Sequence, residues 1–312
     1  MEPLRIIFMG TPQFAVPSLN KLYEAGHQIV AVITAPDKPA GRGMQLTESA
    51  VKKYAAGKNF KILQPEKLKD PEFIKELRAL NADLQVVVAF RMLPEIVWNM
   101  PPKGTINLHA SLLPQYRGAA PINWAIINGE KETGVTTFKL QQEIDTGNIL
   151  LQEKMKIDPD ETAGTLHDKM METGAELIVK TLNELTSGNL TEVAQPSSPP
   201  GPAEELHHAP KLFTETCEID WDKNVDDIYN LIRGLSPYPA AFTFINGKKL
   251  KIYSSEKEKS TSGSEPGKLF TDNKTFLKFS ANDGFISLKE IQLEGKKRMN
   301  IGDFLRGWRQ NN

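Results

Sequence analysis

The sequence predicts an α/β protein in which a mostly parallel, Rossmann-like sheet domain precedes a small β-barrel of the OB type. Apolar runs typical of buried parallel strands alternate with helical patterns through the first 188 residues. A proline-rich stretch follows, and after it come about five short strand patterns that include an Asn246-Gly247 hairpin signal. We therefore expect a first domain over residues 1–188, a proline-rich linker over 189–207 and a second domain over 208–312.

The first domain is expected to contain strands joined mostly by helices. The loop at Gly10–Pro12 holds a single glycine, so a Gly-x-Gly-x-x-Gly fingerprint is absent and we expect no nicotinamide or flavin cofactor. Residues 35–46 (APDKPAGRGMQL) are expected to form an irregular loop. The expected strands are residues 4–9, 27–34, 84–89, 104–109, 133–140 and 148–157. A first helix should follow the Gly10–Pro12 loop and end near residue 26, and further helices should cover 48–57, 71–80, 120–128 and 162–185.

In the second domain a helix over residues 224–235 should precede the strands, because Val225, Ile228, Leu231 and Ile232 recur at helical spacing. The Asn-Gly pair should join two strands over 242–253 as a tight hairpin. Further strands fit residues 267–270, 275–280 and 285–293, and a final helix fits 301–308.

Composition is that of an ordinary globular protein, with 39% hydrophobic and 25% charged residues and a net charge of −1. A single cysteine, Cys217, excludes a disulfide framework and fits a reducing compartment. No basic-then-apolar leader opens the sequence, and no apolar run approaches the ~20 residues of a membrane span. We therefore expect a cytoplasmic protein.

Two polar side chains stand at the end of an expected strand, where open α/β sheets bind ligands. In Gly104–His109 alternate residues share a face, so Ile106 and Leu108 would pack on the core while Asn107 and His109 face a cleft. The Asp145-Thr146-Gly147 turn supplies a carboxylate that, beside His109, would hydrogen-bond and orient the imidazole. An amide donor, a proton carrier and a carboxylate suit acyl-type transfer to an amine through a tetrahedral oxyanion.

Two other chemistries fit poorly. Asp-Thr-Gly is the signature of aspartic proteases, but these need a second carboxylate in the site, and no second such tripeptide occurs. The five histidines are scattered without a His-Glu-x-x-His motif or a cysteine pair, so we expect no metal. The Asn-His-Asp set also needs no serine or cysteine nucleophile, and none with a recognisable motif is present.

The stretch INLHASLLPQYRGAAPINWAI, followed by TGV and IDTG, resembles the formyltransferases that use 10-formyltetrahydrofolate. The opening RIIFMGTPQFAVPSL and the segment PDKPAGRG are most similar to the branch of that family that formylates methionine esterified to initiator tRNA. The resemblance covers nearly the whole chain and is looser in the C-terminal third. It implies folate as co-substrate, no metal, and initiator tRNA as acceptor and partner. We expect a monomer.

The resemblance also implies roles for individual residues. Asn107 and His109 would polarise the formyl carbonyl and Asp145 would tune His109. The loop after the strand at 84–89 would cradle the pterin ring, although Arg91 stands where the family commonly has glycine. The folate-contacting positions would be Phe90, Arg91, Met92, Leu93, Ser111, Leu112, Leu113 and Pro114, largely through backbone. The 35–46 loop would insert near the acceptor end of the tRNA, with Arg42 as the matching position and Lys38 as a second candidate.

The second domain is basic where the rest of the chain is not. Residues 245–312 carry 14 Lys and Arg against 8 Asp and Glu, a net charge of +6 that leaves −7 for the remainder. Such an excess is either a soluble surface or a footprint for an RNA backbone. The candidate tRNA-binding clusters are Lys248, Lys249 and Lys251, and Lys296, Lys297 and Arg298.

Three rival functions stay open at this point. A sibling formyltransferase acting on an amino-sugar nucleotide would have the same Asn-His-Asp set, but the basic C-terminal domain and the GRG loop argue against it. A formyltetrahydrofolate hydrolase would use water as acceptor. An RNA-binding module with an inactive first domain would not need the intact set.

Overall fold

The computed structural model describes residues 3–40, 45–196, 206–260 and 264–308. The chain forms two compact units. Unit 1 comprises Met1–Arg117, Gly134–Met155 and His167–His207, and unit 2 comprises Gly118–Thr133, Lys156–Leu166 and His208–Asn312. Each unit therefore draws on segments that are distant in sequence, and the two are described separately below.

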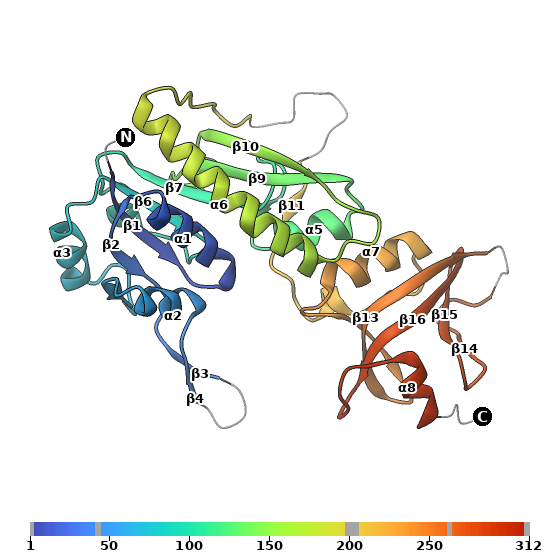
Figure 1. The fold of residues 1–312 in the computed structure, drawn as a ribbon. Coiled ribbons are helices and arrows are strands. Elements are labelled where there is room, and N and C mark those ends of the chain that lie inside the picture. The colour runs from blue at the N-terminus through green and yellow to red at the C-terminus, as the bar shows by residue number, and fades with distance from the viewer. Residues whose placement is uncertain (1–2, 41–44, 197–205, 261–263, 309–312) are drawn as a thin grey trace. The chain divides into compact units, whose positions relative to one another are not determined.

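Unit 1 is built on a seven-stranded sheet in the order β10-β9-β7-β6-β1-β2-β5 (Figure 1). The pairs β1–β2, β1–β6, β2–β5 and β6–β7 are parallel, and β7–β9 is antiparallel. The predicted mostly parallel α/β class is thus confirmed. The strands are β1 (Arg5–Gly10), β2 (Gln28–Ile33), β5 (Ile62–Leu63), β6 (Leu84–Val88), β7 (Thr105–His109), β9 (Glu132–Lys139) and β10 (Ile149–Lys156).

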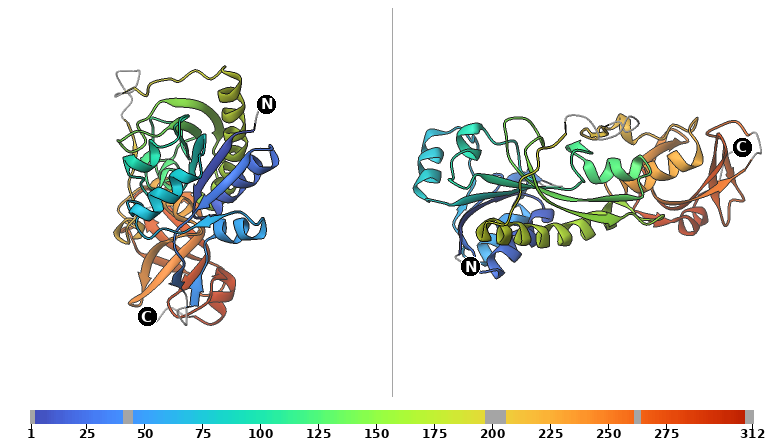
Figure 2. Two further views of the ribbon diagram at one scale, coloured as in Figure 1. Left: turned by 90° about the vertical axis from the view of Figure 1, so that its left-hand side faces the viewer. Right: turned by 90° about the horizontal axis from the view of Figure 1, so that it is seen from above.

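Helices cover both faces of this sheet. On one face, apolar residues of β1 such as Ile7 and Met9 share a core with Phe73 of α3 and Val97 of α4. On the other face α6 runs along the strands (Figures 1 and 2), and its Thr181 hydroxyl lies 2.8 Å from that of Thr137 in β9. The helices are η1 (Gln13–Ala15), α1 (Val16–Glu24), α2 (Ala50–Gly57), α3 (Pro71–Ala79), α4 (Glu95–Trp98) and α6 (Ala163–Ser187).

Local sequence explains where these helices begin. Asp70 caps α3 by accepting hydrogen bonds from the backbone amides of Glu72 and Phe73 at 3.0 and 3.1 Å, and Pro71 fits the first helical position. Ser49 caps α2 by accepting from the Lys52 amide at 3.0 Å. These caps satisfy amides that otherwise have no partner at a helix start.

The expected irregular loop at 35–46 is partly wrong. Lys38–Ala40 (β3) and Gln45–Thr47 (β4) pair as an antiparallel two-stranded sheet. The pairing was missed because proline and glycine mask any alternation, yet Pro39 is tolerated in a two-stranded ribbon, where each strand has a free edge. Asp37, at the base of this hairpin, pairs with Lys52 and accepts a hydrogen bond from Gln64 at 2.8 Å.

Unit 2 contains an antiparallel, barrel-like sheet in the order β12-β13-β16-β15-β14, with β17 paired to β16. Asn246 and Gly247 both have positive φ, 50° and 73°, as a tight hairpin turn requires. Ile228 and Ile232 of α7 (Val225–Leu235) are buried in the same core as the inward residues of the sheet. The strands are β12 (Ala241–Ile245), β13 (Lys248–Lys259), β14 (Leu269–Thr271), β15 (Leu277–Ala281), β16 (Gly284–Leu293) and β17 (Met299–Asn300).

The predicted barrel-type second domain is confirmed, and β17 is a strand that was not predicted. The remaining elements are β8 (Arg117–Gly118), α5 (Pro121–Ile127), β11 (His208–Ala209), η2 (Glu215–Cys217), α7 (Val225–Leu235) and α8 (Ile301–Arg306). Among these remaining elements, the helices α5, α7 and α8 were expected to within a few residues, and the short segments β8, β11 and η2 were not. Among the described residues no helix is both long and apolar enough to cross a bilayer.

Candidate active site

Asn107 and His109 lie at the carboxyl end of β7, next to the parallel strand β6. The predicted alternation holds, since the Ile106 and Leu108 side chains are buried in the core while Asn107 is half-buried. His109 is 7% exposed. Within the described part of the chain the Asn107 amide forms no side-chain hydrogen bond, so it remains available as a donor.

The His109 imidazole is held between two groups. Its Nε2 lies 2.8 Å from the Tyr116 carbonyl oxygen, and its Nδ1 lies 3.8 Å from Oδ2 of Asp145. A carbonyl oxygen can only accept, so Nε2 is the nitrogen that donates to Tyr116, and Nδ1 is the nitrogen that faces the carboxylate. The structure therefore brings the predicted histidine and carboxylate together, at ion-pair distance rather than at the expected hydrogen-bond distance.

The Asp145 carboxylate is presented by an irregular turn between β9 and β10. Asp145 has φ of 55°, a left-handed conformation that aspartate tolerates better than most residues. A Cβ at Gly147 would lie 1.6 Å from the Lys139 carbonyl oxygen, so only glycine fits there. The Gln195 side chain holds the turn, because its Nε2 donates to the carbonyls of Asp145 and Gly147 at 2.8 and 2.7 Å.

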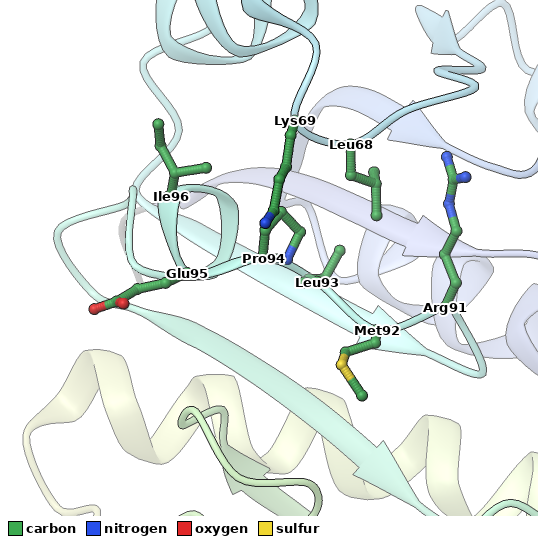
Figure 3. Close-up of a pocket in the computed structure, with 8 residues that line it drawn as sticks. All are labelled: Leu68, Lys69, Arg91, Met92, Leu93, Pro94, Glu95 and Ile96. Atoms are coloured by element: carbon green, nitrogen blue, oxygen red, sulfur yellow. The ribbon is translucent and has the colours of Figure 1, made fainter.

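The loop after β6 contains four of the eight residues expected to contact folate. Because β6 and β7 are parallel neighbours, this loop and the Ser111–Pro114 segment both follow the carboxyl ends of their strands and leave the sheet on the same side. Arg91 and Met92 point to opposite sides of the loop (Figure 3), and Met92 is 72% exposed. A pocket of about 830 Å³ adjoins the loop and is lined by Leu68, Lys69, Arg91, Met92, Leu93, Pro94, Glu95 and Ile96.

Arg91 braces this loop. Its guanidinium donates to the backbone carbonyls of Pro65 and of Glu66, the latter at 2.8 Å, and stacks over the Phe90 ring at 5.6 Å. Partial burial lowers the pKa of Arg91 from its ordinary value. The side chain therefore fixes the loop to the segment before α3.

Two residues that sequence analysis missed form hydrogen bonds with the backbone of the Ser111–Pro114 segment. The Thr136 hydroxyl donates to the Ser111 carbonyl at 2.6 Å and accepts from the Leu113 amide at 3.2 Å. Gln152 donates to the Leu113 carbonyl at 3.0 Å. Ser111 and Leu113 are buried, whereas Leu112 and Pro114 are half-buried. The side chains of Ser111 and Leu113 therefore pack into the protein interior.

The predicted tRNA-binding residues occupy two places. Lys38 is exposed on the β3–β4 hairpin, and Arg42 lies outside the described residues. In unit 2 the antiparallel pairing of β13 with β16 brings the start of one strand beside the end of the other, and the Glu294 amide donates to the Lys249 carbonyl at 2.8 Å. The two basic clusters, almost 50 residues apart in sequence, therefore meet at one end of the sheet.

Not every residue of these clusters presents its charge equally. The Lys251 ammonium donates to the Pro239 carbonyl at 3.1 Å, and Lys249 lies 3.9 Å over the Phe242 ring. Arg298 forms a two-bond pair with Glu290, which raises its pKa. Lys248, Lys296 and Lys297 are exposed.

No group of three or more potential metal ligands gathers anywhere in the described ranges. The residues that sequence analysis missed are Tyr116, Thr136, Gln152 and Gln195. Tyr116 acts through its own backbone carbonyl, and the Thr136 and Gln152 side chains bond to backbone atoms, so the sequence pattern does not mark these three residues. Gln195 was missed for a different reason, because the surrounding proline-rich composition indicates a linker.

Comparison with known proteins identifies the family. The formyl transferase family model matches residues 4–182, and that of the formyl transferase C-terminal domain matches 211–309. A methionyl-tRNA formyltransferase from Parabacteroides distasonis is 55% identical over 315 residues, covering 99% of this chain and 97% of the relative.

Two solved structures share the fold. The sugar 3N-formyl transferase WlaRD, solved in the presence of dTDP and 5-N-formyl-THF, has a TM-score of 0.68 and 22% identity over 95% of this chain and 100% of its own. HypX from Aquifex aeolicus in complex with tetrahydrofolic acid has a TM-score of 0.66 and 17% identity, and the chain spans 50% of its length. The chain belongs to the formyl transferase family, and within it to the methionyl-tRNA formyltransferases.

Proposed function

We propose that this chain transfers the formyl group of 10-formyltetrahydrofolate to the α-amino group of methionyl initiator tRNA. The observation that carries the proposal is the convergence of His109 and Asp145 beside Asn107, in a chain that is 55% identical over its length to a methionyl-tRNA formyltransferase. An aminoacyl-tRNA acceptor supports a cytoplasmic location for the activity, where translation begins.

The reaction forms a bond between the formyl carbon and the methionyl nitrogen and breaks the bond to N10 of the folate. The attacking amine loses one proton and N10 gains one. An α-amine has a pKa near ~7.7–8.0, so the neutral nucleophile is available near pH 7 without a strong base. The residues therefore need to stabilise the oxyanion and to move a proton.

Asn107 is suited to donate to the developing oxyanion, because its amide stands at the strand end and is not engaged elsewhere in the described residues. Removing one such donor costs ~10²–10³ in rate. His109 is suited to carry the proton on Nδ1, since Nε2 is committed to the Tyr116 carbonyl. Asp145, 3.8 Å from Nδ1, stabilises the imidazolium that forms when Nδ1 is protonated.

We assign the folate subsite to the loop Phe90–Leu93 and the wall Ser111–Pro114, which share one edge of the sheet. We assign the tRNA to the hairpin that carries Lys38, to Arg42, and to the basic end of the unit 2 sheet. The exposed Lys248, Lys296 and Lys297 fit a phosphate backbone, whose binding should weaken steeply as salt concentration rises.

The test is incubation with 10-formyltetrahydrofolate and charged initiator tRNA, followed by mass analysis of the released amino acid. We expect formylmethionine. Product on a dTDP-amino sugar instead of the tRNA would favour the sibling acceptor, and folate turnover without any amine would indicate a hydrolase.

The variant His109→Ala should lower kcat by ~10²–10⁴, the usual range for losing a proton-transfer group, while tRNA affinity is unchanged. The matched control is His167→Ala, because His167 lies on α6 and pairs with the adjacent Asp168 at 3.0 Å. Full turnover by His109→Ala would overturn the mechanism.

A further inference from the structure

We propose that Gln195 is a positioning residue that fixes the Asp145 carboxylate beside His109. The inference rests on the proposed function and goes beyond it, because Gln195 touches no reacting group and lies in the proline-rich stretch that follows α6. Its role would be to hold the Asp145–Gly147 turn by hydrogen bonds from a different segment of the chain.

The Gln195 amide is saturated by its neighbours. A primary amide offers two N–H donors and one oxygen with two lone pairs. Both donors are used on the Asp145 and Gly147 carbonyls, at 2.8 and 2.7 Å. The oxygen accepts from Nε and Nη2 of Arg117 at 3.1 and 2.6 Å.

This pattern requires glutamine. The Nε2 atom faces two carbonyl oxygens and donates a proton to each. A glutamate would place a carboxylate oxygen there, which has no proton to donate and would repel both carbonyl oxygens. Glutamate would keep only the contact with the Arg117 guanidinium. The side chain therefore ties the turn to Arg117, which follows Tyr116, the residue whose carbonyl accepts from the other side of the His109 ring.

The stretch around Gln195 is itself fixed in register. Val193 and Ile149 exchange two backbone hydrogen bonds of 2.8 and 2.9 Å. The Glu192 carboxylate pairs with Lys139 and accepts from Asn148 at 3.1 Å. Because both attachments reach β9 and β10, the strands that border the turn, Gln195 is delivered to the turn at a defined position.

The turn needs such support. Asp145 is in a left-handed conformation, which is less favourable for a residue with a side chain than the usual regions. Within the turn, the Thr146 hydroxyl donates to the Glu143 carbonyl at 3.1 Å. Without Gln195, we expect the turn to relax and the carboxylate to move away from Nδ1 of His109.

The experiment compares Gln195→Ala and Gln195→Glu with the intact protein in formyl transfer to charged initiator tRNA. A shift of about 1 Å at a reacting group can cost ~10²-fold, so we expect kcat to fall by ~10- to 100-fold. The KM for tRNA should stay unchanged, because the basic surfaces are untouched. The matched control is Thr191→Ala, an exposed position of the same stretch, which should keep kcat within about threefold.

A double-mutant cycle separates positioning from general damage. In an Asp145→Asn background, measured in single turnovers with excess enzyme, Gln195→Ala should cause less than a twofold further loss, since residues acting as a unit are not additive. An equal loss in both backgrounds would overturn the proposal, as would unchanged kcat in Gln195→Ala or an equal loss in Thr191→Ala.

Amide hydrogen exchange gives a readout that does not depend on the acceptor. The amides of residues 143–148 should exchange faster in Gln195→Ala and Gln195→Glu than in the intact protein, while the amides of the sheet strands keep their protection. Unchanged exchange in this turn would count against the proposal. If the intact protein did not formylate methionyl-tRNA, the proposed function would fail, and the exchange result would still decide whether Gln195 holds the turn.

Discussion

Replacing Gly147 by alanine should disable the site without unfolding unit 1. The added Cβ would lie 1.6 Å from the Lys139 carbonyl oxygen and 2.8 Å from its carbon, and real Cβ atoms essentially never come closer than 3.0 Å to such atoms. The turn and β9 must therefore separate by about 1.4 Å. Because β9 is buried against α6 and β7, we expect the turn to move, and Asp145, two residues away, to move with it.

A displacement of this size at a group that acts on His109 should lower kcat by ~10²-fold. The assay is steady-state formyl transfer with both substrates saturating, together with a thermal melt to show that the variant is folded. Gly57→Ala is the matched control, because Gly57 lies in α2 and a Cβ there meets nothing within 4 Å. A folded Gly147→Ala variant with normal kcat would show that the position of this turn does not govern catalysis.

Three further predictions concern other parts of the molecule. Asn107→Ala should lower kcat by ~10²–10³, and an intact rate would exclude the amide as oxyanion donor. Lys297→Ala should reduce by about 1 the slope of log affinity for tRNA against log salt, whereas Arg298→Ala, paired with Glu290, should reduce it less. Burial, with the hydrogen bond to Asp160, raises the pKa of Tyr229 to about 12. The contribution of the neutral Tyr229 hydroxyl to the free energy of unfolding is therefore fully present below about pH 10 and is lost as the pH rises toward 12. The free energy of unfolding of Tyr229→Phe should therefore fall less steeply over that range, by up to about 1.4 kcal/mol per pH unit.

The fold was predictable because its strands are marked by strong local patterns. Leu84–Val88 is apolar except for Gln85 and is buried throughout, as is typical of a central parallel strand, and the Asn246-Gly247 turn needs residues that accept positive φ. The β3–β4 hairpin and the short strand β5 were not predicted. Their pairing depends on partners supplied by the fold, and segments of two or three residues carry no periodicity.

The candidate site was predictable only where chemistry depends on the side chain. Asn107 and His109 follow from strand alternation, and Asp145 follows from a turn motif. Their supports could not be found in the same way. Thr136 and Gln152 hold backbone atoms of the wall, and many polar residues on a strand could do so, so only the three-dimensional pairing of strands shows which of them do.

Both groups that flank His109 come from strained backbone. Tyr116, whose carbonyl accepts from Nε2, has φ of 59°, and Asp145, whose carboxylate faces Nδ1, has φ of 55°. Conformations of this kind cost free energy and persist when the surroundings hold them in place. Here the holding comes from the stretch after α6, since Gln195 binds the Asp145 turn while the His207 carbonyl accepts from the Tyr116 amide at 2.7 Å and its ring stacks on that of Tyr116 at 5.6 Å. Residues that composition assigns to a linker therefore complete the histidine's surroundings, and exchanging residues 192–196 for a flexible glycine-serine sequence should impair catalysis even though no catalytic side chain is altered.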